Sequence, residues 1–197
     1  MTYEVWLFAD DASYRAGAWS LFQDVPDTPY GYASEDDHAL VMNIATGGGT
    51  LVHEMVHPFM SANFPDAPAW FNEGLASLYE QVGVEDGRIV GYVNWRLPGL
   101  QEAIVNGSLP DFSHFMAQDT PTFYASERGD NYAQARYLCL WLQERGLLRS
   151  FYQMFHANVA SDPTGEASLR AVLRTEDLPA FQEQWQGWLV DLSVGTR

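Results

Sequence analysis

Lysine is absent from this 197-residue chain, and cysteine occurs once. The ten basic residues are all arginines and stand against 26 acidic residues, which gives a formal net charge of −16 at pH 7. A surface with this charge repels phosphate groups, so we expect neither nucleic acid nor an anionic membrane surface as a partner. The single Cys139 cannot form an internal disulfide, and its apolar neighbours, YLCLW, are typical of a buried thiol.

Long apolar runs are also missing. No segment approaches the roughly eighteen apolar residues of a membrane-spanning helix, so we expect no membrane span. The first residues, MTYEVW, lack the basic region and the apolar core of a signal peptide. A secretion signal that had been removed would leave no trace, so the compartment stays open, and so does the oligomeric state.

Hydrophobic residues, by contrast, make up 47% of the chain and aromatic residues 14%, which is typical of a folded protein with a sizeable core. Alternating β-favouring residues predict strands near 3–8, 30–33 and 39–44, and the turn signal Glu85-Asp86-Gly87 predicts a hairpin within 84–94. Helical periodicity predicts helices near 11–23, 50–62, 68–82, 96–106, 111–118, 130–145, 147–158, 165–174 and 177–192. The chain therefore changes from β-rich to helical, which indicates an α+β fold.

The segment HEMVH, residues 53–57, has the pattern H-E-x-x-H. Two histidines four residues apart on a helix lie one turn apart on the same face, so the rings of His53 and His57 can reach one metal ion. Glu54 points to the side of that face, where it can take a proton from a metal-bound water without being a ligand. This spacing predicts a metal site with its own general base.

A catalytic zinc site needs a third protein ligand, and the best candidate is Glu73 in the segment WFNEGLA. Two neutral imidazoles and one carboxylate leave the zinc ion with net positive charge, which acidifies a water molecule and polarises a carbonyl. Glu80 follows Glu73 by seven residues, so on a helix it shares the same face and can accept a hydrogen bond from a ring of His53 or His57. We include Asn72, beside Glu73, as a second supporting residue, and predict one zinc ion per chain.

These residues carry a family resemblance. HEMVH followed by WFNEGLASLYE resembles the gluzincin metallopeptidases, in particular the aminopeptidase N and thermolysin-like group. Their pattern is H-E-x-x-H, a gap of comparable length, then N-E-G and a further glutamate. The resemblance covers about residues 40–80 and implies a zincin-like fold, with His53, His57 and Glu73 as zinc ligands and Glu54 as general base.

A later segment, NYAQARYL at residues 131–138, extends the resemblance. In the aminopeptidase N-like gluzincins, a helix well after the third ligand begins with a tyrosine whose hydroxyl stabilises the oxyanion. Tyr132 is similar in position and context, and a preorganised O–H donor lowers the energy of the charge that develops on a carbonyl oxygen. An ordinary structural tyrosine is the alternative, because the chain has ten tyrosines.

The glycine-rich segment 45–49 has two compatible interpretations. It can be a flexible linker with Thr50 as the N-cap of the metal-binding helix. It can also be a strand edge whose backbone pairs with a peptide substrate, and the resemblance favours this. We therefore predict Asn43, Ala45 and Gly47 as substrate-binding residues.

Pro58 directly follows His57 and conflicts with a regular helix. Proline removes one hydrogen bond and crowds the carbonyl group four residues earlier, here that of Glu54. It also biases His57 away from helical geometry. We therefore expect the helix either to kink or to end at this point.

Together these features predict a zinc metallopeptidase that forms a single domain over residues 1–197. The sheet and the helices of the metal site should occupy about 1–95, and a helical subdomain about 96–197. The G-x-M-E-N segment by which the aminopeptidases recognise a free N-terminus is missing, because Met42-Asn43 lacks the intervening glutamate, so an endopeptidase is slightly favoured. An inactive peptidase-like binding protein and a zinc hydrolase of a non-peptide amide or ester stay open as alternatives.

Overall fold

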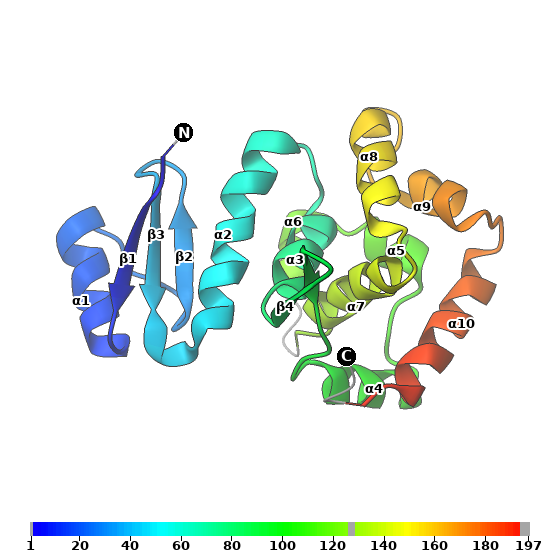
Figure 1. Ribbon diagram of the computed structural model, residues 1–197, viewed down its shortest axis with the longest axis horizontal. Coiled ribbons are helices and arrows are strands. Elements are labelled where there is room, and N and C mark those ends of the chain that lie inside the picture. Colours follow the sequence, from blue (N-terminus) through cyan, green and yellow to red (C-terminus); the bar gives the residue numbers. More distant parts are fainter. Residues whose placement is uncertain (1, 126–128, 194–197) are drawn as a thin grey trace. The chain divides into compact units, whose positions relative to one another are not determined.

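The computed structural model describes residues 2–125 and 129–193 (Figure 1). The chain divides into two compact units, Met1–Asn63 and Phe64–Arg197, here called the N-terminal unit and the C-terminal unit. Within the described residues the chain forms ten α-helices and two small sheets, which confirms the predicted α+β class.

The N-terminal unit is built on a three-stranded sheet in the order β1-β3-β2, in which β3 pairs in parallel with β1 and antiparallel with β2. Val41 lies at the centre of β3 and is opposite Trp6 on one side and Tyr32 on the other. All five residues of β3 are buried because helices α1 and α2 flank the sheet (Figure 1). The elements are β1 (Glu4–Phe8), α1 (Asp11–Phe22), β2 (Gly31–Ser34), β3 (Ala39–Asn43), the 3-10 helix η1 (Ile44–Thr46) and α2 (Gly48–Asn63).

Local sequence explains how α1 begins and what it covers. The Asp10 carboxylate accepts a hydrogen bond from the Ser13 backbone at 2.8 Å, and the Ser13 hydroxyl accepts one from the Asp10 backbone at 3.1 Å. This reciprocal pair satisfies two amides that have no partner inside the helix. Tyr14 and Ala18, four residues apart, then pack on Val41 and form the small core of this unit.

The C-terminal unit is mainly helical and is organised around α3 and α7, which pack along each other. They approach closely at Gly74, where a Cβ atom would lie 3.1 Å from the Ala135 carbonyl oxygen and 3.1 Å from the Cys139 sulfur. The elements of this unit are α3 (Ala69–Leu78), β4 (Val82–Glu85), β5 (Arg88–Gly91), α4 (Leu97–Val105), α5 (Phe112–Met116), α6 (Thr120–Tyr124), α7 (Asp130–Glu144), α8 (Leu148–Asn158), α9 (Glu166–Leu173) and α10 (Leu178–Asp191).

A buried arginine fixes the C-terminal end of α3. Arg136 on α7 is fully buried, and its Nε donates to the Ser77 carbonyl oxygen at 2.9 Å while Nη2 donates to the Tyr92 carbonyl oxygen. A positive charge at a helix C-terminus is favourable because the last carbonyl groups lack partners in the helix. Burial lowers the pKa of Arg136 to about 10, so the side chain stays charged at neutral pH.

Most predicted helices and strands lie within two residues of their expected limits, and the hairpin β4–β5 turns at Asp86-Gly87, as predicted. Helix α6 was not predicted. We expected a subdivision near residue 95. The unit boundary instead follows Asn63, because α3 packs with the later helix α7. No helix of the described part of the chain combines the length and the apolarity needed to cross a membrane.

Several local predictions around α2 and α3 are wrong. Thr50 is not the N-cap, because α2 begins at Gly48 and Thr50 lies within its first turn. At Pro58 we expected the helix either to kink or to end, and it does not end, since α2 continues to Asn63. Helix α3 ends at Leu78, so Glu80 does not share a helical face with Glu73.

Candidate functional site

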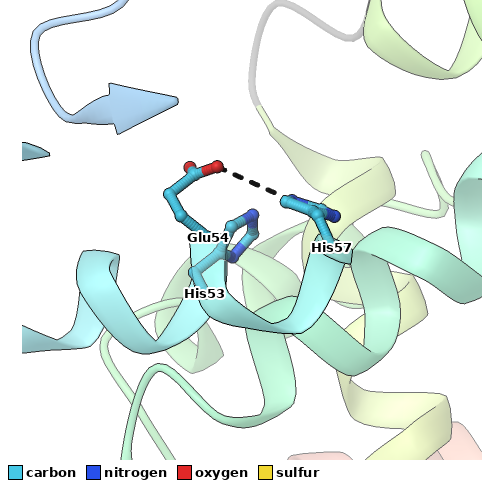
Figure 2. A group of neighbouring side chains, drawn as sticks. All are labelled: His53, Glu54 and His57. Atoms are coloured by element: carbon cyan, nitrogen blue, oxygen red, sulfur yellow. Dashed lines mark ion pairs between the residues drawn. The ribbon is translucent and has the colours of Figure 1, made fainter. Parts of the chain in front are cut away.

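Helix α2 places the three residues of the motif in one group (Figure 2). The rings of His53 and His57 have centroids 5.0 Å apart at an interplanar angle of 75°. Glu54 rises beside them, with its Oε2 4.0 Å from Nε2 of His57, which is too long for a hydrogen bond. The helical spacing therefore does bring both rings to one region of the helix surface.

This group has the donor chemistry of a zinc site. One ligand atom from each of His53, Glu54 and His57 lies within 4.8 Å of the others. Imidazole nitrogens and carboxylate oxygens are both common zinc ligands. The side chains of Glu54 and His57 are only 13% and 19% exposed, so water is largely, though not wholly, excluded. The residues fit a zinc ion as two ligands with a carboxylate beside them.

The negative charge of Glu54 also acts on the core of the N-terminal unit. Tyr14 is fully buried, and burial raises the pKa of its hydroxyl to about 12, with a further contribution from the charge of Glu54. Tyr14 is therefore neutral at physiological pH. A neutral phenol adds no negative charge beside Glu54.

The predicted third ligand, Glu73, lies in the C-terminal unit on α3 and is 4% exposed. Its Oε1 accepts a hydrogen bond of 2.6 Å from the hydroxyl of Tyr124, at the end of α6. Tyr132, on the first turn of α7, packs beside Tyr124 with ring centroids 6.2 Å apart. The structure therefore links Glu73 and Tyr132 in one side-chain cluster through Tyr124, which contacts both.

Glu80 is part of a second polar group in the same unit. Arg96 binds both of its carboxylate oxygens, at 2.7 and 3.1 Å, and the Asn94 amide donates to it at 3.1 Å. The guanidinium carbon of Arg96 also lies 5.4 Å from the ring centroid of Tyr132, within the range of a cation–π interaction. Glu80 is thus linked through Arg96 to the Tyr132 ring, while its predicted hydrogen bond with a histidine stays a prediction.

Asn72 lies in the first turns of α3 and is partly buried. Its backbone amide donates to the Pro68 carbonyl oxygen at 3.1 Å, which closes the first turn of the helix. This bond fixes the backbone directly before Glu73. The supporting role predicted for the Asn72 side chain stays a prediction.

The strand-edge explanation for the substrate-binding residues is wrong. Strand β3 is central and pairs on both sides, and residues 44–46 leave the sheet as the 3-10 helix η1. Asn43 is 3% exposed, and its side chain stabilises this exit by donating to the Pro29 carbonyl oxygen and accepting from the Ala45 amide. Gly47 has a φ of +108°, which favours glycine at the end of this turn. A peptide that adds a strand to this sheet must use β1 or β2 instead.

Sequence reasoning did not identify Tyr124 or Arg96. Tyr124 is 51 residues from Glu73, and no motif joins the two. One local signal was available for its helix, because Asp119 followed by Thr120-Pro121 has the form of an N-cap with proline in the first turn. The Asp119 carboxylate does accept from the Thr122 amide at 2.9 Å, and hydrogen bonds from Thr122 lower the pKa of Asp119.

The predicted site residues thus fall into two sets. His53, Glu54 and His57 belong to the N-terminal unit, whereas the predicted third ligand, Glu73, and the predicted oxyanion donor, Tyr132, belong to the C-terminal unit. Comparison of the chain with known proteins gives no match to a family model, a curated protein or a solved structure. A functional proposal therefore depends on the chain's own residues.

Proposed function

We propose that this protein is a zinc-dependent metallopeptidase of gluzincin type. His53, His57 and Glu73 hold one zinc ion per chain. The observation that carries the proposal is the grouping of two imidazole rings 5.0 Å apart with a carboxylate beside them on α2. The buried carboxylate of Glu73, clustered with Tyr132, supports it from the C-terminal unit.

The residues divide the chemistry between them. A zinc ion held by these donors lowers the pKa of a water molecule and polarises a peptide carbonyl. Glu54 accepts the proton of the attacking water and returns it to the leaving amine. Tyr132 donates its O–H to the carbonyl oxygen as negative charge develops there.

The substrate is a peptide or an unfolded protein segment that binds in extended form. Helix α2 packs on β2 and β3, and β2 is the edge strand of that pair. An extended peptide can pair with an edge strand through its backbone, which places little demand on its sequence. This mode does not require a free N-terminus and agrees with endopeptidase action.

The test is Glu54→Gln in the full-length protein. Glutamine keeps the shape of the side chain but cannot accept the proton, and general-base catalysis contributes about 100- to 10,000-fold in rate. We expect hydrolysis of an unstructured protein to fall by that factor, while zinc content, measured by elemental analysis, stays at one ion per chain. Glu102→Gln, the same change at an exposed position of α4, is the matched control and should leave both values unchanged.

Three outcomes would replace the proposal. A parent protein that takes up no zinc has no metal site of this kind. Zinc-loaded parent that cleaves esters or non-peptide amides, but no peptide, is a hydrolase of another class. Zinc-loaded parent that cleaves none of these is an inactive binding protein on a peptidase-like scaffold.

A further inference from the structure

The hydrogen bond between Tyr124 and Glu73 joins an accessible ring to an enclosed carboxylate. Tyr124 is 48% exposed and Glu73 is 4% exposed, and their oxygens are 2.6 Å apart. A distance this short is typical of an O–H donor bonded to an ionised carboxylate. We propose that Tyr124 is a positioning residue, whose hydroxyl holds the Glu73 carboxylate in the orientation that binds zinc. This inference rests on the proposed function.

The surroundings of Tyr124 hold its backbone firmly. Phe123, the preceding residue, is fully buried and packs against Phe115 and Tyr132, with ring centroids 6.3 and 5.3 Å away. The Asn131 amide, itself 7% exposed, donates to the Phe123 carbonyl oxygen at 2.8 Å and to the Gln118 side chain at 3.0 Å. Asn131 therefore ties the end of α6 to the start of α7, so the phenol reaches Glu73 from a fixed position.

A glutamate ligand benefits from such a partner because its side chain has several possible rotamers. A glutamate has three side-chain torsions, and each added orientation that misses the ion weakens binding. Residues that hydrogen-bond a metal ligand fix its orientation, and their removal costs about 10- to 100-fold in metal affinity. The Tyr124 hydroxyl occupies one carboxylate oxygen, Oε1, and so restricts how the group can turn.

Tyr132 has a different role from Tyr124 in the proposed function. Its ring packs against Phe123 and Tyr124 and lies near the Arg96 guanidinium group. The proposed function assigns its hydroxyl to the substrate carbonyl and not to a zinc ligand. Loss of the Tyr124 hydroxyl should therefore lower metal affinity, whereas loss of the Tyr132 hydroxyl should lower the rate of hydrolysis.

The experiment measures the zinc dissociation constant by competition with a chelating dye, in the full-length protein. Tyr124→Phe should raise this constant about 10- to 100-fold, and should move the zinc concentration needed for half-maximal hydrolysis upward by the same factor. Tyr132→Phe should leave the dissociation constant near that of the parent and lower the rate at saturating zinc. Tyr152→Phe removes the same atom from a ring that packs on Phe64 and Phe71, and is the control with unchanged zinc affinity.

A double-mutant cycle tests whether Tyr124 acts through Glu73. In a Glu73→Gln background the added effect of Tyr124→Phe on the dissociation constant should largely disappear, because the two residues act as one unit. A full effect in that background, or unchanged zinc affinity in Tyr124→Phe, would overturn the inference and leave the proposed function standing. A loss of rate at saturating zinc without a loss of affinity would place Tyr124 in the chemistry and also overturn it. A parent that binds no zinc would overturn both.

Discussion

The two units supply their candidate groups in different ways. In the N-terminal unit, His53, Glu54 and His57 come from five consecutive residues of one helix. In the C-terminal unit, Glu73, Tyr124 and Tyr132 come from three helices, and 51 residues separate the ends of the hydrogen bond that joins Glu73 to Tyr124. One set depends on helical periodicity alone, whereas the other depends on tertiary packing.

The cores of the two units also differ, because the C-terminal core contains more large aromatic rings around its site helix. The N-terminal unit packs Tyr14 and Ala18 of α1 against Ala39 and Val41 of β3. The C-terminal unit encloses α3 among large rings, in which Trp70 and Phe71 contact residues of α8 at centroid distances of 5.2–6.3 Å. Glu73 is therefore carried by a helix fixed on several sides, while the histidines lie on a partly buried helix.

The largest effect is expected at the proposed zinc ligands. His57→Ala and Glu73→Ala should each weaken zinc binding by more than the roughly 100-fold that follows loss of a supporting residue. Isothermal titration of the metal-free protein with zinc measures this. His114→Ala, at an exposed position of α5, is the control and should bind as the parent does.

A different result would make the comparison sharper. If Glu73→Ala kept full zinc affinity, the ion would belong to the N-terminal unit alone. Glu54 would then serve as a ligand beside the two histidines, and Glu54→Gln would lose zinc as well as activity. Measuring the two variants together decides between these arrangements.

The sequence predicted those features that depend on local periodicity and not on tertiary packing. Helices α7, α8 and α10 were expected within one residue of their limits, because apolar periodicity is a local signal. The grouping of His53 with His57 was likewise predictable from spacing alone. The assignment of these residues to zinc and to peptide hydrolysis stays a prediction.

Features that depend on distant contacts were not predictable. The apolar run of β3 fits any buried strand, so the sequence does not show that β3 lies between β1 and β2. This central position means that β3 has no free edge for a substrate. Helix α3 ends at Leu78, two residues before Glu80. Arg136 of the later helix α7 binds the carbonyl groups at this end of α3. The contact of Tyr124 with Glu73 required the packing of α6 beside α3.

The next prediction compares the two cores. Trp70 is 1% exposed, and its Nε1 donates to the Thr164 carbonyl oxygen at 2.9 Å. Trp70→Ala should lower the free energy of unfolding of the C-terminal unit by about 3–5 kcal/mol, because a cavity and an unsatisfied carbonyl remain. Val41→Ala in β3 removes two methyl groups and should cost the N-terminal unit about 1.6 kcal/mol, at about 0.8 for each.

Native-state hydrogen exchange measures both changes, read at amides of α7 for the first and of β3 for the second. Trp95→Ala is the control for residue type, because Trp95 is 66% exposed and should change stability by less than about 1 kcal/mol. If Trp70→Ala and Val41→Ala lowered the free energy of unfolding by the same amount, the aromatic core would not distinguish the two units.

The smallest expected effect concerns the close approach of α3 to α7. A methyl group at Gly74 would lie 3.1 Å from both the Ala135 carbonyl oxygen and the Cys139 sulfur. Overpacking costs about 1–3 kcal/mol, and the better helix propensity of alanine returns up to about 1 kcal/mol, so Gly74→Ala should destabilise the C-terminal unit by roughly 1 kcal/mol. Gly187 in α10 has no neighbouring atom within 4 Å of the same position, so Gly187→Ala should stabilise the unit by up to about 1 kcal/mol.

Zinc affinity makes these two glycine variants informative about the site as well. Displacing α3 from α7 moves Glu73 relative to Tyr124 and Tyr132, which lie on α6 and α7. A misplaced ligand loses metal affinity even when the chain stays folded, so Gly74→Ala should bind zinc more weakly than the parent, whereas Gly187→Ala should not. If Gly74→Ala were destabilised but bound zinc as tightly as the parent, the position of Glu73 would depend on Tyr124 and the aromatic core more than on the contact between α3 and α7.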